Sequence, residues 1–532
     1  MMTRREKTAF FDFKETDLPQ QTGVNMTTPE TPAAYNRLVE LLREKSVLGS
    51  CASLLGWDEQ TYMPPGGGEH RANQLALLAG LTHERATSAE LGETLAELQE
   101  LETSSGVDSV FAVNIREARR DYNRATQLPR RLVEEMTREI SLAQQKWVEA
   151  RKQADFSIFR QSLENIIRLK REEAKILSKA GESLYDALLD EYEPGMKATQ
   201  VQALFDPLRE GVIKILQQIN ESGVKPQTEI LKRSYPTDRQ HTLGQAAAAQ
   251  IGFDFERGRL DTTAHPFCSE IGPGDCRLTT RYFENFFNSG FFGILHEAGH
   301  GMYEQGLNPE QYGLAMGNSV SLGIHESQSL LWENFVGRSR PFWTCFFPKL
   351  QETYPESLSE ADTDEFYTAF NDVRPSYIRV EADELTYNLH IMLRFELEQM
   401  LIGGELEAAD VPEAWNQRFT EYLGITPEND SQGCLQDIHW SAGLLGYFPT
   451  YALGKMYSAQ FFKAAQDQLT DLNGQISRGE FGELKSWLNK NIHDRGKQYQ
   501  ARDLVKVVTG EELSEKPLLE ALGNKYAEIY GF

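Results

Sequence analysis

Two histidines and a glutamate form the pattern with the clearest chemical meaning in this chain. Residues 296–300 read His-Glu-Ala-Gly-His. Residues four apart on a helix are separated by about 40° around the axis, so His296 and His300 present both imidazoles on one face. Two such rings can bind one Zn²⁺, and Glu297 is placed to reach a water beside it. The spacing predicts a metal-dependent hydrolase, with two structural core histidines as the alternative.

A catalytic zinc site usually takes a third protein ligand. The segment His325-Glu326-Ser327-Gln328 follows, and its apolar neighbours are spaced as in a second core helix. An acid among apolar residues is costly to bury without a cation. We expect Glu326 to be the ligand rather than His325, because a helix aims only one of two adjacent side chains at the same point.

The rest of the chain is predicted to be mainly helical, because apolar residues recur at steps of three and four. Pro129 is expected to divide residues 109–181 into two long helices. Further helix breaks are predicted near Gly306, Gly403 and Pro449. Long helices of this kind usually form a wall or lid, and we assign no chemistry to them.

Residues 251–284 interrupt the helical pattern. They carry β-branched and aromatic residues around the turn Gly272-Pro273-Gly274, which predicts a small antiparallel sheet near the metal site. The expected fold class is therefore mainly α, a large helical body with one small sheet. We interpret residues 1–28 as a flexible N-terminal extension and residues 29–532 as a single helical domain.

The composition excludes several classes of function. The 532 residues carry a net charge of −25 at a pI near 5.0, so a nucleic-acid partner would be repelled by most of the surface. No stretch approaches 18 consecutive apolar residues, which argues against a membrane span. The five cysteines form no Cys-x-x-Cys pair, and an odd, scattered set favours a reducing cytoplasm over a disulfide scaffold.

Six short segments occur in a fixed order along the chain: HPF at His265, DCRLT at Asp275, HEAGH at His296, HESQ at His325, IRVEAD at Ile378 and GCLQDIHW at Gly433. Together they resemble the motif set of the carboxypeptidase Taq family of zinc metallocarboxypeptidases. The early segment WDEQTYMPPGGGEHRANQLALL is also similar to that family, so the resemblance extends from about residue 33 to the C-terminus.

This resemblance implies a function and a set of metal ligands. By it, His296, His300 and Glu326 hold one Zn²⁺ per chain, or Co²⁺ in its place, and Glu297 is the general base and acid. The family is largely helical with a long deep groove like that of neurolysin-type peptidases. It usually forms homodimers, and it removes single residues from peptide C-termini with broad preference.

Two arginines are the candidates for recognising the substrate's free carboxylate, which a planar guanidinium binds bidentately. Arg379 is the first candidate, and Asp383 one helical turn later is expected to hold it. An ordinary surface ion pair is the alternative. Arg277 is the second candidate, with Asp275 on the same face of a strand as its partner.

Three further residues are candidates for the substrate-binding surface. His439 is placed to donate a hydrogen bond to the peptide carbonyl or the tetrahedral intermediate, unless it is a structural histidine bonded to Asp437. His265, held extended by the following proline, either lines the groove or shapes the chain. Tyr447 or Tyr451 would suit an oxyanion donor, and the sequence does not choose between them.

Two other functions fit the same motifs. One is a groove-type zinc endopeptidase or oligopeptidase, because His-Glu-x-x-His occurs in both kinds of enzyme. The other is a non-enzymatic helical protein that holds a metal and binds peptides. Glu297 argues against the second, because a structural metal site needs no base.

Overall fold

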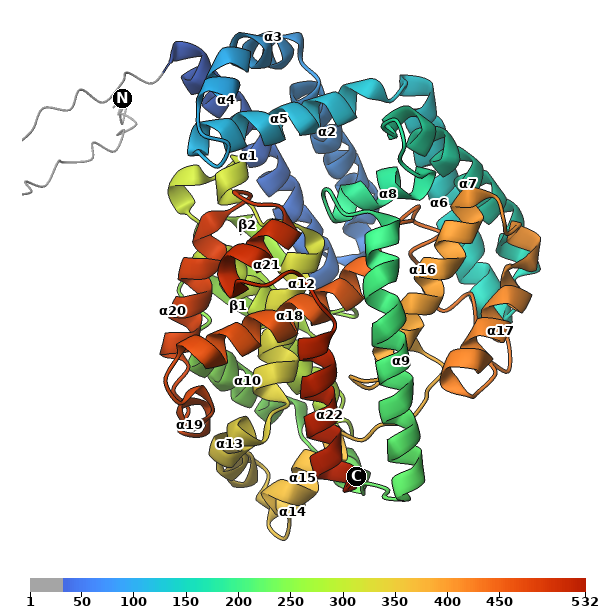
Figure 1. Ribbon diagram of the computed structural model, residues 1–532, viewed down its shortest axis with the longest axis vertical. Coiled ribbons are helices and arrows are strands. Elements are labelled where there is room, and N and C mark those ends of the chain that lie inside the picture. The colour runs from blue at the N-terminus through green and yellow to red at the C-terminus, as the bar shows by residue number, and fades with distance from the viewer. Residues whose placement is uncertain (1–31) are drawn as a thin grey trace, which may run out of the picture.

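Helices dominate the computed structural model, which describes residues 32–532. The extension predicted for residues 1–28 lies outside these described residues. Figure 1 shows the helices around one small sheet. The helices before the sheet are α1 (Ala33–Thr61), α2 (Gly68–Ala86), α3 (Ala89–Glu97), α4 (Gln99–Ser104), α5 (Val110–Gln127), α6 (Arg130–Gln153), α7 (Ser157–Leu177), α8 (Leu184–Tyr192), α9 (Ala198–Ser222) and α10 (Thr237–Ile251).

The region predicted as two helices contains three. Pro129 separates α5 from α6 as expected, but a second break separates α6 from α7. Ala154 has a φ of 54°, a left-handed conformation that ends α6. Alanine normally favours helix, so nothing in the local sequence marks this break.

The small sheet is present, but it is mixed rather than antiparallel. Its strands are β1 (Gly258–Thr262), β2 (Cys268–Gly272) and β3 (Asp275–Thr280), in the order β1-β3-β2. The β2–β3 hairpin is antiparallel, whereas β1 pairs with β3 in parallel. The difference arises because residues 263–267 carry the chain across β3, so β1 and β2 lie on opposite sides of it. The antiparallel sheet predicted from the sequence is therefore correct for the β2–β3 pair and wrong for the β1–β3 pair.

The chain after the sheet is helical, and the breaks predicted near Gly306, Gly403 and Pro449 are confirmed as helix boundaries. A π-helical segment at Leu331–Gly337 continues α12. The helices are α11 (Phe287–Gly306), α12 (Leu322–Leu330), α13 (Arg340–Thr353), α14 (Pro355–Leu358), α15 (Thr363–Phe370), α16 (Tyr387–Gly403), α17 (Val411–Leu423), α18 (Pro449–Gln468), α19 (Leu472–Ser477), α20 (Gly482–Asn491), α21 (Ala501–Thr509) and α22 (Lys516–Tyr530).

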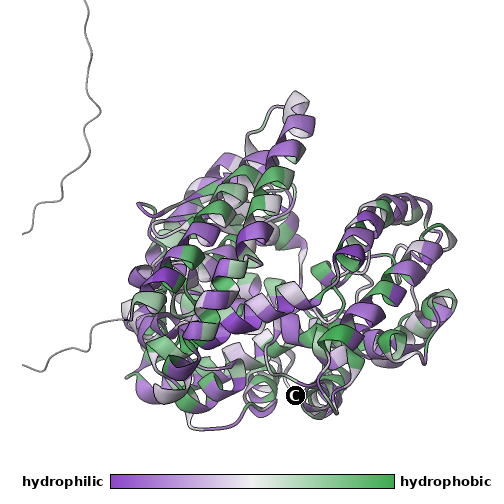
Figure 2. Cartoon of the chain, turned by 90° about the horizontal axis from the view of Figure 1, so that it is seen from above, coloured by the Kyte–Doolittle hydropathy of each residue, from purple (hydrophilic) through white to green (hydrophobic). Residues whose placement is uncertain are grey.

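Two groups of helices flank the centre of the molecule. In Figure 1, α6, α7, α16 and α17 lie on one side and the sheet and α20 on the other, with α18 between them. Figure 2 shows the two groups from above, and polar and apolar residues alternate around individual helices. One continuous set of buried apolar side chains extends from Ala143 to Tyr530, and a smaller set joins α1, α3 and α5. This core holds α11, α12 and α18 in contact at the centre.

Candidate active site

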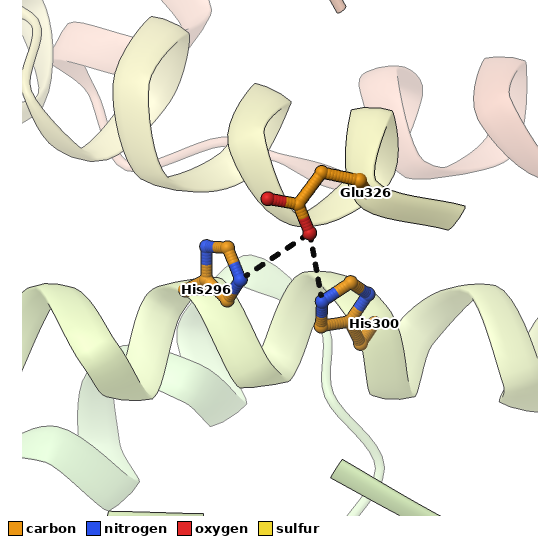
Figure 3. A group of neighbouring side chains, drawn as sticks. All are labelled: His296, His300 and Glu326. Atoms are coloured by element: carbon orange, nitrogen blue, oxygen red, sulfur yellow. Dashed lines mark ion pairs between the residues drawn. The ribbon is translucent and has the colours of Figure 1, made fainter. Parts of the chain in front are cut away.

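Two helices bring three possible metal ligands together. His296 and His300 lie on α11, and Figure 3 shows Glu326 of α12 pointing at both rings. Glu326 Oε2 lies 3.7 Å from His296 Nε2 and 3.5 Å from His300 Nε2. Within residues 32–532, this is the one group of three or more His, Cys, Asp or Glu residues whose ligand atoms all lie within 4.8 Å of one another. The neighbours of a tetrahedral zinc are separated by about 3.3 Å, so the donors fit this ion.

Gly299 permits the close approach of α11 and α12. A Cβ built on this glycine would lie 2.6 Å from backbone atoms of Gln328 and Ser329. No side chain fits at this distance. A glycine between the two histidines is therefore required for Glu326 to reach them.

The ring of His296 is supported by a carboxylate behind it. His296 Nδ1 lies 3.0 Å from Glu333 Oε2, and Arg338 donates to Glu333 Oε1 through Nε at 3.2 Å and Nη2 at 3.0 Å. With Nδ1 donating to Glu333, Nε2 is left free to bind a metal. Glu333 was not predicted, although its position seven residues after Glu326 places both on one helix face.

The ring of His300 is supported by a second histidine. His325 Nδ1 lies 2.6 Å from His300 Nδ1, and His325 Nε2 lies 2.6 Å from Glu304 Oε1. His325 therefore supports a ring of the candidate metal site instead of joining the three converging atoms. Glu304 was not predicted either, although it continues the four-residue spacing of His296 and His300.

The charges around the site suit a cation. The side chains of His296, His300 and Glu326 keep 22, 15 and 15% of their surface exposed, so solvent reaches them from one side. Burial lowers the pKa of His300 to about 4, which keeps the ring neutral. Burial alone would lower the pKa of His296, but Glu326 and Glu333 raise it to about 10. The carboxylates of Glu326 and Glu333 therefore favour positive charge at this point, and a bound divalent cation would be stabilised in the same way.

Glu297 is buried beside these ligands. Burial raises the pKa of Glu297 to about 7, although the charge of His296 opposes the shift. A carboxyl group with a pKa near neutrality can both accept and return a proton. Its assignment as the base stays a prediction.

Arg379 is buried and held in place, but not by the predicted partner. Its Nε and Nη2 donate to Asp437 Oδ1 at 3.0 and 2.8 Å, and Nη1 donates to the Tyr387 hydroxyl at 2.7 Å. Asp383 instead accepts a hydrogen bond from the backbone N–H of Thr386 at 2.8 Å. The predicted Arg379–Asp383 pair is wrong because residues 379–383 form a 3-10 turn and a loop instead of a continuous helix.

Asp437 links two arginines in the interior. Arg394 of α16 donates from Nε to Asp437 Oδ2 at 2.7 Å, on the opposite side from Arg379. Burial would raise the pKa of Asp437, but the two guanidinium groups hold it well below its usual range. Three of the five side-chain N–H groups of Arg379 donate to Asp437 and Tyr387, and the other two have no partner among residues 32–532.

His439 is not bonded to Asp437 as the alternative interpretation required. Its Nδ1 lies 4.0 Å from Asp437 Oδ1, too far for a hydrogen bond, and its Nε2 lies 3.2 Å from the Tyr451 hydroxyl. Burial lowers the pKa of His439 to about 4, so the ring is neutral. The ring of Tyr447 lies 5.3 Å from that of His439, and burial and the charge of Glu326 raise the Tyr447 pKa. His439 is thus near Asp437, the partner of Arg379, and Tyr447 is near enough to Glu326 for that charge to act on its hydroxyl.

The remaining candidates lie on a strand of the sheet and in one of its loops. Arg277 of β3 donates to Asp275 at 2.8 and 2.7 Å, which confirms that pair, and its guanidinium lies 4.2 Å from the ring of Trp57 on α1. Trp57 was not predicted, because no spacing links α1 to β3. His265 is exposed in the loop between β1 and β2, so a place in the site stays a prediction.

Comparison with known protein families decides the family. The family model for carboxypeptidase Taq (M32) metallopeptidase matches residues 37–526. The chain belongs to this family. It is a metallocarboxypeptidase, and membership implies a metal ion at a site such as the His-His-Glu group.

Two curated relatives cover nearly the whole M32 chain. A thermostable carboxypeptidase 1 from Thermus thermophilus is 47% identical over 513 residues, covering 95% of this chain and 100% of the relative. Carboxypeptidase 1 from Bacillus subtilis is 39% identical over 493 residues, covering 92% and 97%.

Solved structures of the family share the fold. An M32 carboxypeptidase from Deinococcus radiodurans superposes with a TM-score of 0.90 at 38% identity, covering 94% of this chain and 100% of the other. Metallocarboxypeptidase 1 from Trypanosoma cruzi gives a TM-score of 0.89 at 33% identity, covering 93% and 99%. The mainly helical body with one small sheet is confirmed.

Proposed function

We propose that this enzyme is a zinc-dependent carboxypeptidase that removes single residues from the C-termini of peptides with broad specificity. The observation that carries the proposal is the convergence of His296, His300 and Glu326, with Glu297 beside them. The family supports the reaction class, and the resemblance supports the breadth of specificity.

The metal ligands and the base have distinct tasks in this proposal. A Zn²⁺ ion held by His296, His300 and Glu326 would polarise the scissile carbonyl and make water a stronger acid. Glu297 accepts the proton of the attacking water and delivers it to the leaving amine. A carboxylate beside the metal ligands suits both transfers.

Recognition of the peptide end determines which bond is cut. Arg379 has two unused N–H groups and is held rigidly by Asp437, so it can bind the terminal carboxylate without reorganising. His439 contacts Tyr447, and Glu326 is close enough to raise the pKa of Tyr447, so both residues suit donors to the peptide or the oxyanion. Arg277 is proposed as a second clamp, and His265 as a further substrate contact.

One assay tests this function and distinguishes a carboxypeptidase from the alternative, an endopeptidase. A mixed peptide pool is incubated with zinc-loaded and with chelated protein, and mass spectrometry shows which end shortens. We expect loss of single C-terminal residues with zinc and no loss after chelation. C-terminally amidated twins should resist cleavage, and equal cleavage of both would favour an endopeptidase. Zinc content without cleavage of any peptide would favour a non-enzymatic protein.

We also propose a homodimeric, cytoplasmic enzyme whose catalytic domain is residues 29–532. Helix α2 buries none of its 19 residues, and Leu77 on it and Val47 on α1 are 65 and 53% exposed, which supports an interface at this hairpin. All five cysteines are free, as suits a reducing compartment. No helix in the described part is long and apolar enough to cross a membrane. Light scattering that gave a monomer mass would contradict the dimer.

A further inference from the structure

Two buried glutamates that the proposed chemistry does not use lie behind the site. Glu193, which follows α8, and Glu398 of α16 are both completely buried. Each accepts hydrogen bonds from one tyrosine hydroxyl, one backbone N–H and one further side chain. Their surroundings are therefore matched, although they contact different parts of the active site.

Glu193 holds the beginning of the helix that carries Glu326. The Ser321 hydroxyl and the Gly323 N–H, both at the start of α12, donate to Glu193 at 3.1 Å each. The Tyr457 hydroxyl of α18 donates at 2.8 Å. A carboxylate is favourable at a helix N-terminus, where the unpaired N–H groups lie. Glu193 thus joins α12 to α18 one turn before Glu326.

The packing of α12 against α18 is close at this point. A Cβ on Gly323 would lie 2.5 Å from Glu193 Oε2 and 3.0 Å from the ring of Tyr457. On the same face of α12, a Cβ on Gly454 of α18 would lie 2.8 Å from Glu326 Cγ. The position of Glu326 therefore depends on the contact between α12 and α18, and Glu193 is a buried polar link in that contact.

Glu398 holds the substrate-recognition segment, residues 433–448. The Trp440 Nε1–H and the Gly446 N–H of this segment donate to Glu398 at 2.9 and 3.0 Å, and the Tyr185 hydroxyl donates at 2.8 Å. Arg394, one turn earlier on α16, binds Asp437 of the same segment. Helix α16 thus fixes the segment at Asp437, Trp440 and Gly446.

We propose that Glu193 and Glu398 are positioning residues with separate tasks. Glu193 sets the affinity for the catalytic metal through α12, and Glu398 sets the affinity for the substrate's terminal carboxylate through residues 433–448. The second half rests on the proposed function, whereas the first half needs only the metal site.

The substitutions Glu193→Gln and Glu398→Gln test this, each serving as the other's control. Glutamine has nearly the same shape, but its amide nitrogen cannot accept, so a buried donor loses its partner. The first measurement is the Kd for Zn²⁺ by competition with a chromophoric chelator. The second is the Kd of a free-carboxylate peptide and of its amidated twin, by calorimetry on zinc-loaded proteins that also carry Glu297→Gln to prevent turnover.

Each variant is expected to weaken a different one of the two affinities. Glu193→Gln should raise the Kd for Zn²⁺ about tenfold or more and change the peptide Kd by less than about twofold once zinc is saturating. Glu398→Gln should leave the Kd for Zn²⁺ within about twofold and raise the Kd of the free-carboxylate peptide about tenfold, equivalent to one buried hydrogen bond. The amidated peptide should respond less.

A milder pair of variants keeps the test valid if a glutamine variant does not fold. Tyr457→Phe and Tyr185→Phe each remove only one donor, the first from Glu193 and the second from Glu398. We expect smaller changes in the same parameters, about two- to fivefold. Circular dichroism and melting temperature establish that each variant is folded.

The outcomes distinguish the two halves. If the two glutamates were purely structural, both variants would lower the melting temperature, and neither would change one Kd selectively. Equal effects of a variant on both affinities, or on neither, would overturn the proposal. If Glu193→Gln weakens zinc binding but no peptide binds the parent protein, the proposed function fails while the first half stands. If peptides bind normally and Glu398→Gln changes nothing, the second half is wrong.

Discussion

The metal-binding side and the substrate-binding side of this active site are built differently. His296, His300 and Glu304 share one face of α11, so a single helix sets their relative directions. Arg379 lies in a short turn and depends on Asp437, 58 residues away in the chain. A helix orients its side chains by itself, whereas a turn needs partners from elsewhere. A substitution on the metal-binding side should therefore affect metal binding alone. A substitution on the substrate-binding side should also disturb the residues that hold Arg379.

The largest effect is expected on the metal side, from His300→Ala. Removing one of three ligands should abolish zinc binding and peptide cleavage together, because two remaining donors hold the ion weakly. Zinc content by mass spectrometry and C-terminal cleavage by peptide mapping check this. Stoichiometric zinc in a folded His300→Ala protein would contradict the ligand set.

Glu297→Gln should separate chemistry from metal binding. We expect kcat to fall by about 10²- to 10⁴-fold, the usual contribution of a general base, with one zinc per chain retained. Glu310→Gln, at an exposed glutamate on the same stretch of chain, is the control and should be fully active. Substantial turnover by Glu297→Gln would exclude Glu297 as the base.

On the substrate side, Arg379→Lys should lower kcat/KM for free-carboxylate peptides by about 100-fold and leave zinc affinity unchanged. Lysine cannot reproduce the paired contacts to Asp437 or bind a carboxylate bidentately. Steady-state kinetics on the free and amidated forms measure the effect. The matched control is Arg374→Lys, whose side chain is 61% exposed. An equal fall in kcat/KM for the free and the amidated peptide would mean that Arg379 does not bind the terminal carboxylate.

The remaining prediction concerns the pH dependence of stability. Burial raises the pKa of Glu398 from the ordinary 4.5 to about 7. Between these values the folded protein keeps a proton that the unfolded chain has released, so stability falls as the pH rises from about 4.5 to 7. The loss would be up to about 3 kcal/mol.

Glu398→Gln should remove this component and make the profile shallower, because Glu193 and Glu297 also have pKa values raised to about 7. Urea unfolding at several pH values compares it with the parent protein and with Glu405→Gln, an exposed glutamate beyond the end of the same helix. Parallel pH profiles for all three proteins would contradict the raised pKa.

The prediction of the site from sequence succeeded where spacing along one element carried the information. The helix breaks and the Asp275–Arg277 pair were predicted in this way and are confirmed. Glu333 and Glu304 continue helical spacings that were available in the sequence but not followed. The break at Ala154 and the parallel pairing of β1 had no local signal, since both depend on how distant segments pack.

The sequence by itself determined the reaction class, because the His-Glu-x-x-His pattern and five other ordered motifs each consist of neighbouring residues and can be recognised without the tertiary structure. It also determined the mainly helical body, since helical periodicity is a property of neighbouring residues. Only the tertiary structure decided that Asp437, not Asp383, holds Arg379, and that His325 supports His300. These contacts join segments brought together by burial of the common core, and no rule of spacing links residues whose separation in the chain is arbitrary.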